Sequence, residues 1–435
     1  MRHAPGFVQS RVMDQFVVEG GTRLEGSVSV RGAKNAVLKH LVATLLAPGS
    51  HRIDNVPDIL DVELMGQVLA HIGAECTFDG AAVSIEVPDE LLPEAPIHLV
   101  RRMRASILVL GALLARTGEA RVALPGGDDF GSRPIDIHVD GLEAMGAEFE
   151  LIHGVLHASA PDGLSGAEVY FEFPSVGATE NLLLAGVMAK GTTRIGNAAR
   201  EPEIQDLAAL LTGMGASIDG AGTSTIEIEG VPRLSPTVHR AVPDRLAAGT
   251  FLVGAAITGG EVTVRDCVPD HLRMELRKLA DAGCEWEAGD DWVTVRGPDQ
   301  PAPVDFATLP YPGFHTDMHP QMVALLTRAS GTSVITENIY SARFRYVGEL
   351  NRMGADVQIE GQHVIIRGID QLSGCPVDAC DIRAGAALVL AGMAADGYTT
   401  VLNVEHIDRG YEGFANKLAG LGATIRRETV ESSVT

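Results

Sequence analysis

One short motif recurs six times along the chain at nearly even spacing, and this repeat restricts the fold more than any other feature of the sequence. Each copy reads an apolar residue, Gly, and then Ala or Cys before a polar, strand-like segment, and its glycines are Gly73, Gly146, Gly215, Gly283, Gly354 and Gly422. Successive copies are 73, 69, 68, 71 and 68 residues apart. Because chance does not produce so even a period, the chain is predicted to consist of six similar units.

A second motif keeps the same period. In each unit an apolar run ends in a Gly turn and an alternating segment follows, as in LLAPGSHRIDNV (45–56) and MAADGYTTVLNV (393–404). The run has little polar face and therefore indicates a buried helix that ends near a Gly, while alternation indicates a half-buried strand. The expected fold is α/β: six βαβαββ-like units in two three-unit domains, with helices inside and sheets outside. Stacking as a solenoid is the alternative, but the period is long for one.

Composition limits the partners of the chain. Of 435 residues, 46% are apolar and 21% are charged, which permits large cores, and the formal net charge is −23. An acidic chain binds nucleic acid and anionic membranes poorly, because Lys and Arg supply most of that affinity. We therefore expect small-molecule substrates, no nucleic acid and no membrane.

The cysteines and the first residues favour a cytosolic protein. Five cysteines at these spacings match no zinc pattern, so reduced thiols are expected. No apolar run approaches the roughly 18 residues of a membrane span. The segment MRHAPGFVQSRV (1–12) lacks the apolar centre of a signal peptide.

Polar residues gather where the buried helices are expected to begin. Helix N-termini carry unpaired N–H groups and attract anions, so opposed domains would aim six such ends at one cleft and favour a polyanionic ligand. Ordinary helix capping explains the Ser, Thr and Asp residues equally well. It does not explain Lys34 and Arg104, which have no acidic residue nearby in the sequence. The residues at the six starts are Lys34 and Asn35; Arg104; Ser175, Gly177 and Thr179; Asp244 and Arg245; Asp317; Asp381 and Arg383.

A set of motifs in this order resembles the UDP-N-acetylglucosamine 1-carboxyvinyltransferases over nearly the whole chain. The motifs are GAKN (32–35), MRAS (103–106), LPGGDDFGSRPIDIH (124–138), PSVGATEN (174–181), NAAREPEI (197–204), PDR (243–245), FHTDMHPQ (314–321), DIRAGAALVLAG (381–392) and HIDRGYE (406–412). The resemblance implies a two-domain inside-out α/β barrel. It places the first domain at 34–242 with a catalytic loop at 124–134, the second at 1–33 plus 243–435, and the active site in the cleft between them.

The resemblance also implies the reaction and its substrates. The enolpyruvyl group of phosphoenolpyruvate passes to the 3′-hydroxyl of UDP-N-acetylglucosamine with release of phosphate, the first committed step of peptidoglycan synthesis, without cofactor or metal. By residue matching, Lys34, Asn35, Arg133 and Arg409 bind phosphoenolpyruvate. Matching assigns the nucleotide sugar to Arg104, Arg133, Pro134, Ile135, Asp136, Ile137, Ser175, Val176, Gly177, Asp317 and Ile339.

Addition and elimination need acid–base groups at the acceptor hydroxyl and at C3 of the enolpyruvate. The resemblance makes Asp317 the candidate near the hydroxyl, as base or as orienting group, and adds Lys34 and Arg409 to the catalytic set. Asp128 stands where most of the family has the Cys that acts as general acid and that fosfomycin alkylates. Because a carboxylate lacks the soft thiolate, fosfomycin resistance is predicted.

Three alternatives remain open at the level of sequence. The first is an enolpyruvyl transferase that uses shikimate 3-phosphate as acceptor, although such enzymes lack the PGG-acid loop and RPIDIH. The second is a paralogue that uses another uridine nucleotide as acceptor. The third is a catalytically silent homologue that only binds ligands. The presence of Lys34, Arg133 and Asp317 argues against the silent homologue.

Overall fold

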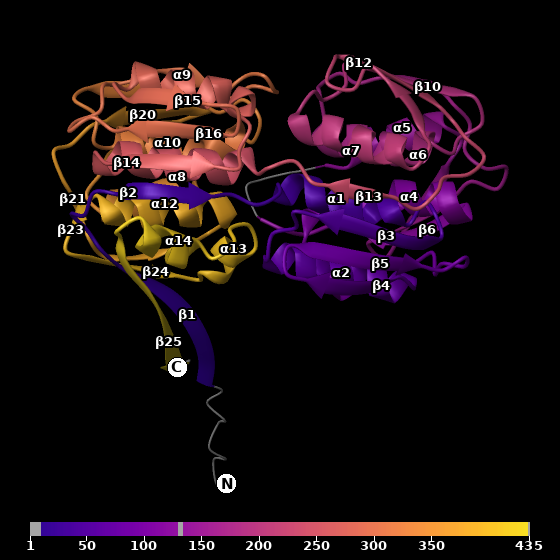
Figure 1. Ribbon diagram of the computed structural model, residues 1–435, viewed down its shortest axis with the longest axis horizontal. Helices are drawn as coiled ribbons and strands as arrows, with labels where there is room; N and C mark the ends of the chain where they lie inside the picture. The colour runs from indigo at the N-terminus through magenta and orange to yellow at the C-terminus, as the bar shows by residue number, and fades with distance from the viewer. Residues whose placement is uncertain (1–9, 129–133, 434–435) are drawn as a thin grey trace, which may run out of the picture.

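The structure is a computed structural model that describes residues 10–128 and 134–433. Two lobes lie side by side (Figure 1). The core of the first lobe takes buried residues between Val37 and Ala241. The core of the second takes the segment from Phe16 to Val30 together with buried residues from Leu246 to Ala423. We propose the domain division 34–242 and 1–33 plus 243–435, which agrees with the membership of these two cores.

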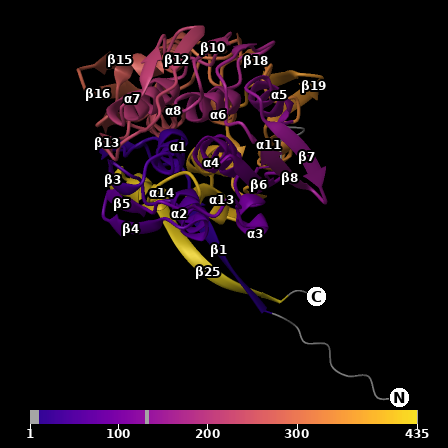
Figure 2. The same cartoon turned by 90° about the vertical axis from the view of Figure 1, so that its right-hand side faces the viewer.

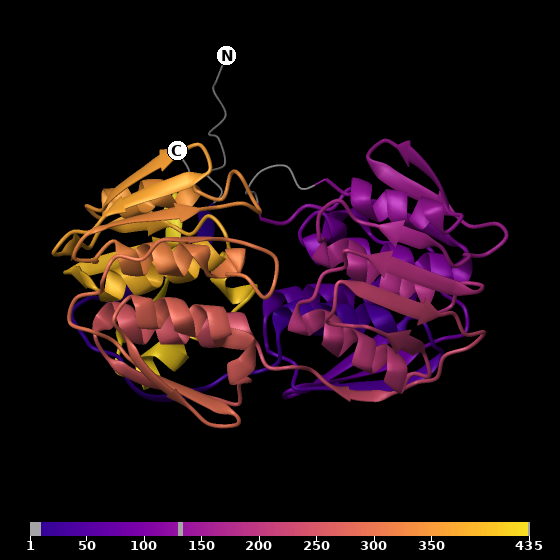
Figure 3. The same ribbon diagram turned by 90° about the horizontal axis from the view of Figure 1, so that it is seen from above.

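Within residues 10–128 and 134–433, six helices form the interior, three in each lobe. The sheets lie around these helices (Figure 3). Their burial follows from their sequences: every residue of α12 is buried, and α6 and α8 contain long runs of Ala, Gly and Leu that allow close packing. The inner helices are α1 (Lys34–Thr44), α4 (Val109–Thr117), α6 (Val176–Gly186), α8 (Arg245–Thr258), α10 (His319–Leu326) and α12 (Ile382–Met393). The remaining helices lie nearer the surface: α2 (Leu60–Ile72), α3 (Ile97–Val100), α5 (Asp136–Ala144), α7 (Pro202–Gly213), α9 (Arg273–Asp281), α11 (Arg345–Arg352), α13 (Glu405–Asp408) and α14 (Phe414–Gly420), with 3₁₀ turns η1 (Arg104–Leu108), η2 (Pro269–Leu272) and η3 (Thr316–Met318).

One strand order is repeated in the sheets of the first lobe: an outer parallel strand, a central strand, and two antiparallel strands. The middle sheet has only an isolated parallel bridge, between Glu94 and Arg121, in place of the outer strand. The sheets are β13 (Val238–Arg240), β3 (Gly49–Asp54), β5 (Ala82–Val87) and β4 (Glu75–Asp79); β6 (Glu119–Ala123), β8 (Val155–Ser159) and β7 (Glu148–Ile152); β9 (Glu168–Tyr170), β10 (Thr192–Gly196), β12 (Thr225–Glu229) and β11 (Ser217–Asp219).

The second lobe repeats the same order three times and adds a short pair of strands. Its sheets are β2 (Glu25–Ser29), β14 (Glu261–Arg265), β16 (Trp292–Arg296) and β15 (Glu285–Ala288); β17 (Phe306–Ala307), β18 (Thr332–Thr336), β20 (His363–Arg367) and β19 (Asp356–Glu360); β22 (Pro376–Asp378), β24 (Tyr398–Leu402), β1 (Ser10–Glu19) and β25 (Thr424–Ser433); and the pair β21 (Leu372–Ser373) and β23 (Ala395–Asp396). The predicted six-unit fold with internal helices is therefore confirmed.

Strands from distant parts of the chain close each lobe. β13 pairs in parallel with β3, so the last strand of the first lobe completes its first sheet. In the second lobe, β2 from near the N-terminus pairs in parallel with β14. β1 pairs antiparallel with both β24 and β25. The paired β1 and β25 extend beyond the lobe as a two-stranded ribbon (Figure 2). Across the described residues, we find no helix with the length and apolarity needed to cross a membrane.

Candidate active site

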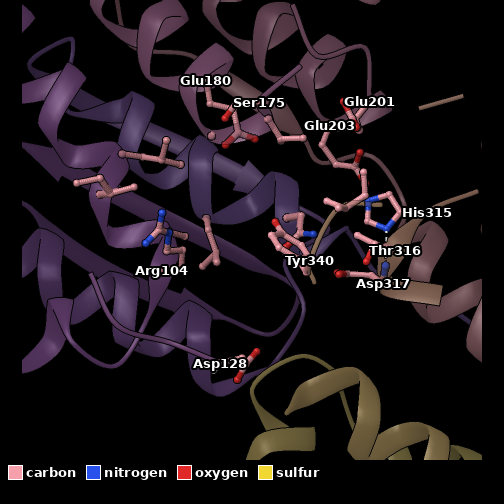
Figure 4. Close-up of a pocket in the computed structure, with 18 of the residues that line it drawn as sticks. Arg104, Asp128, Ser175, Glu180, Glu201, Glu203, His315, Thr316, Asp317 and Tyr340 are labelled. Carbon is pink, nitrogen blue, oxygen red and sulfur yellow. Dashed lines mark hydrogen bonds between the residues drawn. The ribbon is translucent and has the colours of Figure 1, made fainter. Parts of the chain in front are cut away.

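A cavity lies between the lobes, and the N-terminal ends of all six inner helices, or of the 3₁₀ turns that precede them, contribute to its wall. Side chains from both lobes face this space in Figure 4. The sequence predicted that helix starts of the two domains face one cleft, and in the structure helix starts of both lobes line this one cavity. The residues that line the cavity at these starts are Lys34, Asn35, Arg104, Ser175, Val176, Gly177, Arg245, Thr316, Asp317, Ile382 and Arg383.

A chain of ion pairs joins the lobes at one end of the cavity. The Nζ of Lys34 lies 2.8 Å from Oδ2 of Asp61, a buried residue in the first turn of α2. Arg409, from the second lobe, donates to Asp61 with its Nε at 2.9 Å and to Asp128 with its Nη1 at 2.6 Å. Lys34, which has no acidic neighbour in the sequence, therefore finds its partner in another helix. Two carboxylates hold the two cations in place.

The surroundings of Asp128 keep this carboxyl ionised. Burial alone would raise its pKa, but His406 and the positive charges of Arg409 and Lys34 more than offset burial and hold the pKa of Asp128 well below its usual range. His406 Nδ1 lies 3.8 Å from Asp128 Oδ1, which is an electrostatic approach and longer than a hydrogen bond. A proton is therefore held on Asp128 only after these positive charges acquire another partner.

Asp317 occupies the other side of the cavity between two buried arginines. Arg343 Nη1 lies 2.8 Å and Arg383 Nε 3.3 Å from its two carboxylate oxygens. Burial would raise the pKa of Asp317, yet the two guanidinium charges hold it well below its usual range. The backbone N–H of Asp317 donates to the ring of His315 at 3.0 Å, and that ring caps η3. Asp317 is therefore an ionised and tightly oriented acceptor.

Glu337 fixes the backbone beside Asp317. Its carboxylate is 1% exposed and accepts from the Thr308 and Thr316 hydroxyls at 2.8 and 2.9 Å. It also accepts from the backbone N–H groups of Ile339 and Tyr340 at 2.8 and 3.0 Å. Ile339 and Tyr340 both line the cavity. The buried carboxylate thus holds the turn that presents Ile339 to the site.

The wall predicted to bind the nucleotide belongs to the first lobe. Arg104 Nη2 donates to the Pro134 carbonyl at 3.0 Å, which ties η1 to the segment before α5. Ser175 caps α6 by accepting from Ala178 N–H at 3.3 Å. At Gly177 a Cβ would lie 3.0 Å from the His138 ring, so a larger residue would force the wall to shift.

The predicted residues distribute as follows. Those that line the cavity are Lys34, Asn35, Arg104, Asp128, Pro134, Asp136, Ile137, Ser175, Val176, Gly177, Asp317, Ile339 and Arg409. Ile135 is not among the lining residues and packs against the core of the first lobe. Arg133 lies outside the described residues.

Sequence reasoning missed several residues of the wall. Asp61 looks like an ordinary acidic residue at a helix start, and Arg343 lies in a segment without a motif. Glu180 is 1% exposed, faces the cavity, and has Oε1 at 3.6 Å from Lys39 Nζ. Burial raises the pKa of Glu180 to about 8. Glu180 lies between Thr179 and Asn181, directly before the apolar run LLLAG (182–186), and a charged residue beside such a run is the signal that could have identified it.

A second pair of charges crosses between the lobes. Arg245 at the start of α8 donates to both oxygens of Glu203 in α7, at 3.0 and 3.2 Å, and both side chains are buried. The Tyr311 N–H lies 3.5 Å from Glu201, and the Tyr311 ring faces the guanidinium of Arg245 at 5.2 Å. Glu201 and Glu203 therefore hold a backbone N–H and an arginine, respectively.

Known proteins resemble this chain over almost its full length. A family model described as EPSP synthase (3-phosphoshikimate 1-carboxyvinyltransferase) matches residues 18–418. A UDP-N-acetylglucosamine 1-carboxyvinyltransferase of Corynebacterium jeikeium is 52% identical over 95% of this chain and 99% of its own. One of Mycolicibacterium paratuberculosis is 53% identical over the same shares.

Solved structures agree with the sequence relatives. The enolpyruvyl transferase NikO from Streptomyces tendae has a TM-score of 0.87 and 26% identity, covering 97% of this chain and 100% of its own. EPSP synthase from Acinetobacter baumannii, at a TM-score of 0.74 and 19% identity over 95% of this chain and 100% of its own, shares the fold. On its fold and its sequence relatives, the chain belongs to the enolpyruvyl transferase family, among the UDP-N-acetylglucosamine 1-carboxyvinyltransferases.

Proposed function

We propose that this chain transfers the 1-carboxyvinyl group of phosphoenolpyruvate to the 3′-hydroxyl of UDP-N-acetylglucosamine and releases phosphate, in the cytosol, as the first committed step of peptidoglycan synthesis. The relatives that share about half of its residues are named for this activity. The observation that carries the proposal is the cavity itself, in which cations and helix N-termini of both lobes surround two oriented aspartates, Asp128 and Asp317.

Phosphoenolpyruvate places a phosphate and a carboxylate within a small volume. The proposed binding residues are Lys34, Asn35, Arg409 and Arg133. Lys34 and Arg409 are already held close together by their shared partner Asp61, so little side-chain entropy is lost when they bind an anion. The dipole of α1, which begins at Lys34, adds to the attraction.

The acceptor is assigned to the wall opposite. Arg104 supplies a cation for the diphosphate, and Ser175, Val176 and Gly177 offer the N-terminal N–H groups of α6. The segment from Pro134 to Ile137 is assigned to the uracil through its backbone. Asp317 and Ile339 complete the site near the sugar.

The reaction proceeds by addition and elimination. Oxygen of the 3′-hydroxyl bonds to C2 of the enolpyruvate as C3 takes a proton, giving a tetrahedral adduct. C3 then loses a proton as the C2–O bond to phosphate breaks, which restores the double bond in the product. One acid–base group at C3 therefore serves both steps, and we assign it to Asp128.

Asp128 must gain a proton to begin this sequence, although it is ionised in the structure. Substrate phosphate and carboxylate would take over Arg409, which now pairs with Asp128, and Lys34, whose charge lies near Asp128 while its amine pairs with Asp61. Losing those positive charges and gaining negative neighbours both raise the pKa of a carboxyl. The proton donor is therefore formed by the substrate that it protonates.

Asp317 is assigned an orienting role at the acceptor hydroxyl. A carboxylate held by Arg343 and Arg383 has a low pKa and is a weak base, but it remains a good hydrogen-bond acceptor. Accepting from the hydroxyl aims the oxygen at C2. The oxygen becomes strongly acidic as the C2–O bond forms, so its proton passes to the adjacent Asp317 carboxylate and from there to solvent.

The test is release of phosphate from phosphoenolpyruvate with each acceptor in turn. We expect turnover with UDP-N-acetylglucosamine and none with UMP or shikimate 3-phosphate. Turnover only with another acceptor would keep the chemistry and reject the proposed substrate. No turnover with any acceptor, while phosphoenolpyruvate still binds in calorimetry, would favour a silent ligand-binding homologue.

A further inference from the structure

Three potential metal ligands meet in the first lobe outside the cavity. His40 comes from α1, Asp206 from α7 and His239 from β13, elements that pack together in the lobe (Figure 2). One ligand atom of each residue lies within 4.8 Å of those of the other two. His239 Nε2 is 2.8 Å from Asp206 Oδ1, and His40 Nε2 is 3.3 Å from Asp206 Oδ2. No sequence spacing revealed this group, because three separate elements supply it.

His40 is the unusual member. Its side chain is fully buried, and among the described residues neither ring nitrogen has a hydrogen-bond partner. Its Nε2 lies 3.3 Å from Asp206 Oδ2, but the two groups are not aligned for a hydrogen bond. Buried polar groups almost always have a partner, and each one without a partner calls for an explanation such as an ion. An ion bound at Nε2 would supply the missing partner there.

The residue types and separations suit a small transition-metal ion. Imidazole and carboxylate groups bind Zn²⁺, and three protein ligands plus water form a common zinc arrangement. Bonds of about 2.0–2.1 Å in a tetrahedron place ligand atoms about 3.3 Å apart. The separation of 3.3 Å between His40 Nε2 and Asp206 Oδ2 already fits. His239 Nε2 contacts the other oxygen, Oδ1, at 2.8 Å, so small side-chain rotations are needed to bring one atom of each residue, now within 4.8 Å of one another, to the tetrahedral spacing.

The cluster is also accessible and partly oriented. The side chains of Asp206 and His239 are 11% and 15% exposed, which leaves a route for the ion and for a water ligand. Asp206 Oδ2 accepts from the backbone N–H of Val242 at 2.8 Å. Such an outer contact fixes the direction of a ligating carboxylate.

We propose that His40, Asp206 and His239 bind one first-row divalent transition-metal ion of the Zn²⁺ type, with water as a further ligand. β13 is the last strand of the first lobe before the chain enters α8. The same connecting segment is held by Asp244, whose Oδ2 accepts from the Lys34 N–H at 3.1 Å. The bound ion would therefore fasten the segment that joins the lobes to α1 and α7, and its role is structural.

The experiment uses the full chain after treatment with EDTA and dialysis. Zn²⁺ is added, unbound metal is removed, and metal per chain is measured together with the melting temperature. The same is done with Co²⁺, whose visible absorption reports nitrogen and oxygen ligands. The variants are His239→Gln, at the more exposed position, and His40→Leu, which fills the buried site with an apolar side chain. His71→Gln, at an exposed histidine of α2, is the matched control.

We expect one Zn²⁺ per chain and a higher melting temperature in the wild-type protein and in His71→Gln. Both effects should be lost in His239→Gln, and in His40→Leu if that variant folds. Absence of bound metal in the wild type, or equal binding by His239→Gln, would overturn the proposal. Because no substrate is present, these outcomes are independent of the proposed transferase activity.

Discussion

At the scale of single residues, the charged side chains of the site share partners, so that one carboxylate or one guanidinium serves two neighbours. Asp61 serves both Lys34 and Arg409, and Arg409 in turn also serves Asp128. Any anion that enters must compete with these carboxylates for the same cations. The arrangement couples the charge of the substrate to the protonation of Asp128, and this coupling leads to three predictions.

Asp128→Asn should keep substrate binding and lose catalysis, because an amide cannot deliver a proton to C3. The expected decrease in kcat is about 10²–10⁴-fold, the usual contribution of a general acid. Steady-state phosphate release measures kcat, and calorimetry with phosphoenolpyruvate checks that the binding site survives. Unchanged kcat would remove Asp128 from the mechanism.

The pH dependence of Asp128→Cys should differ from that of the wild type. An acid must be protonated to act, so kcat falls as pH rises through the pKa that the group has in the substrate complex. A thiol has a reference pKa of about 8.5 and a carboxyl about 3.9, so the descending limb should lie at higher pH in the variant. Profiles of kcat against pH for both proteins make the comparison, and coincident limbs would contradict it.

The same substitution should create sensitivity to fosfomycin. The wild-type carboxylate is a poor nucleophile toward the epoxide, whereas the thiolate is a good one. We expect full wild-type activity after incubation with the drug, and time-dependent loss in Asp128→Cys with an adduct on residue 128 by mass spectrometry. An adduct on Asp128 of the wild type would refute the prediction of resistance.

Asp317→Asn should affect both stability and catalysis. Removing the charge leaves Arg343 and Arg383 without their principal counter-charge in a buried setting, which costs about 3–5 kcal/mol when one partner of a buried pair is lost. We expect lower kcat and higher KM for the nucleotide sugar, with KM for phosphoenolpyruvate changed less. Denaturant unfolding gives the free energy, and Asp299→Asn, which loses only an exposed pair with Arg23 and lies outside the cavity, is the control.

At the scale of elements, the inner helices carry the site because their N-terminal ends open on the cavity while their bodies form the cores. Capping is needed where such an end cannot be solvated fully. Asp381 caps α12 by accepting from the N–H groups of Arg383 and Ala384 at 2.8 and 2.9 Å, and Asp244 caps α8 in the same way. At these two helix starts the cap and the cation that lines the cavity, Arg383 or Arg245, are therefore distinct residues.

Asp381→Ala should destabilise the protein by about 0.5–2 kcal/mol, the range measured for loss of an N-cap. Asp381→Asn keeps an oxygen acceptor and should recover most of the loss. Thermal and urea unfolding measure both variants. A loss in the Asn variant equal to that in the Ala variant would show that the charge of Asp381, rather than its cap, stabilises α12.

At the scale of the whole molecule, two lobes with separate cores meet around the cavity through a few buried charges. Arg245–Glu203 and Arg409–Asp128 both cross between them. Pairs such as these fix orientation through geometry, since desolvation offsets much of their Coulomb attraction. These specific partners therefore help to fix the relative position of the lobes.

Glu203→Ala should leave Arg245 buried without a partner and lower the free energy of unfolding by about 3–5 kcal/mol. Glu227→Ala is the matched control, because its pair with Arg194 is exposed and weak. Denaturant unfolding of the two variants makes the test. Equal effects would show that the contact between the lobes does not depend on this pair.

Much of the fold was predictable because short sequence patterns encode its helices, turns and strands locally. The six glycine motifs, the apolar runs and the alternating segments each report on neighbouring residues, so units and internal helices could be inferred. The closing strands were harder: β13 pairs with β3 and β2 with β14 across long stretches of chain, and strand pairing depends on partners that no local pattern names. Family motifs, not periodicity, suggested where the N-terminal strands belong.

The sequence by itself determined which residue types face the cavity, since helix starts with Lys34, Arg104 and Asp317 are visible in it. Only the tertiary structure decided how those charges are shared. Asp61 holds Lys34, and Arg343 holds Asp317, because helices and loops far apart in the chain bring opposite charges within hydrogen-bonding distance. The protonation state of Asp128 was likewise decided in three dimensions. A carboxyl pKa reflects burial and nearby charge, and both are properties of the folded chain.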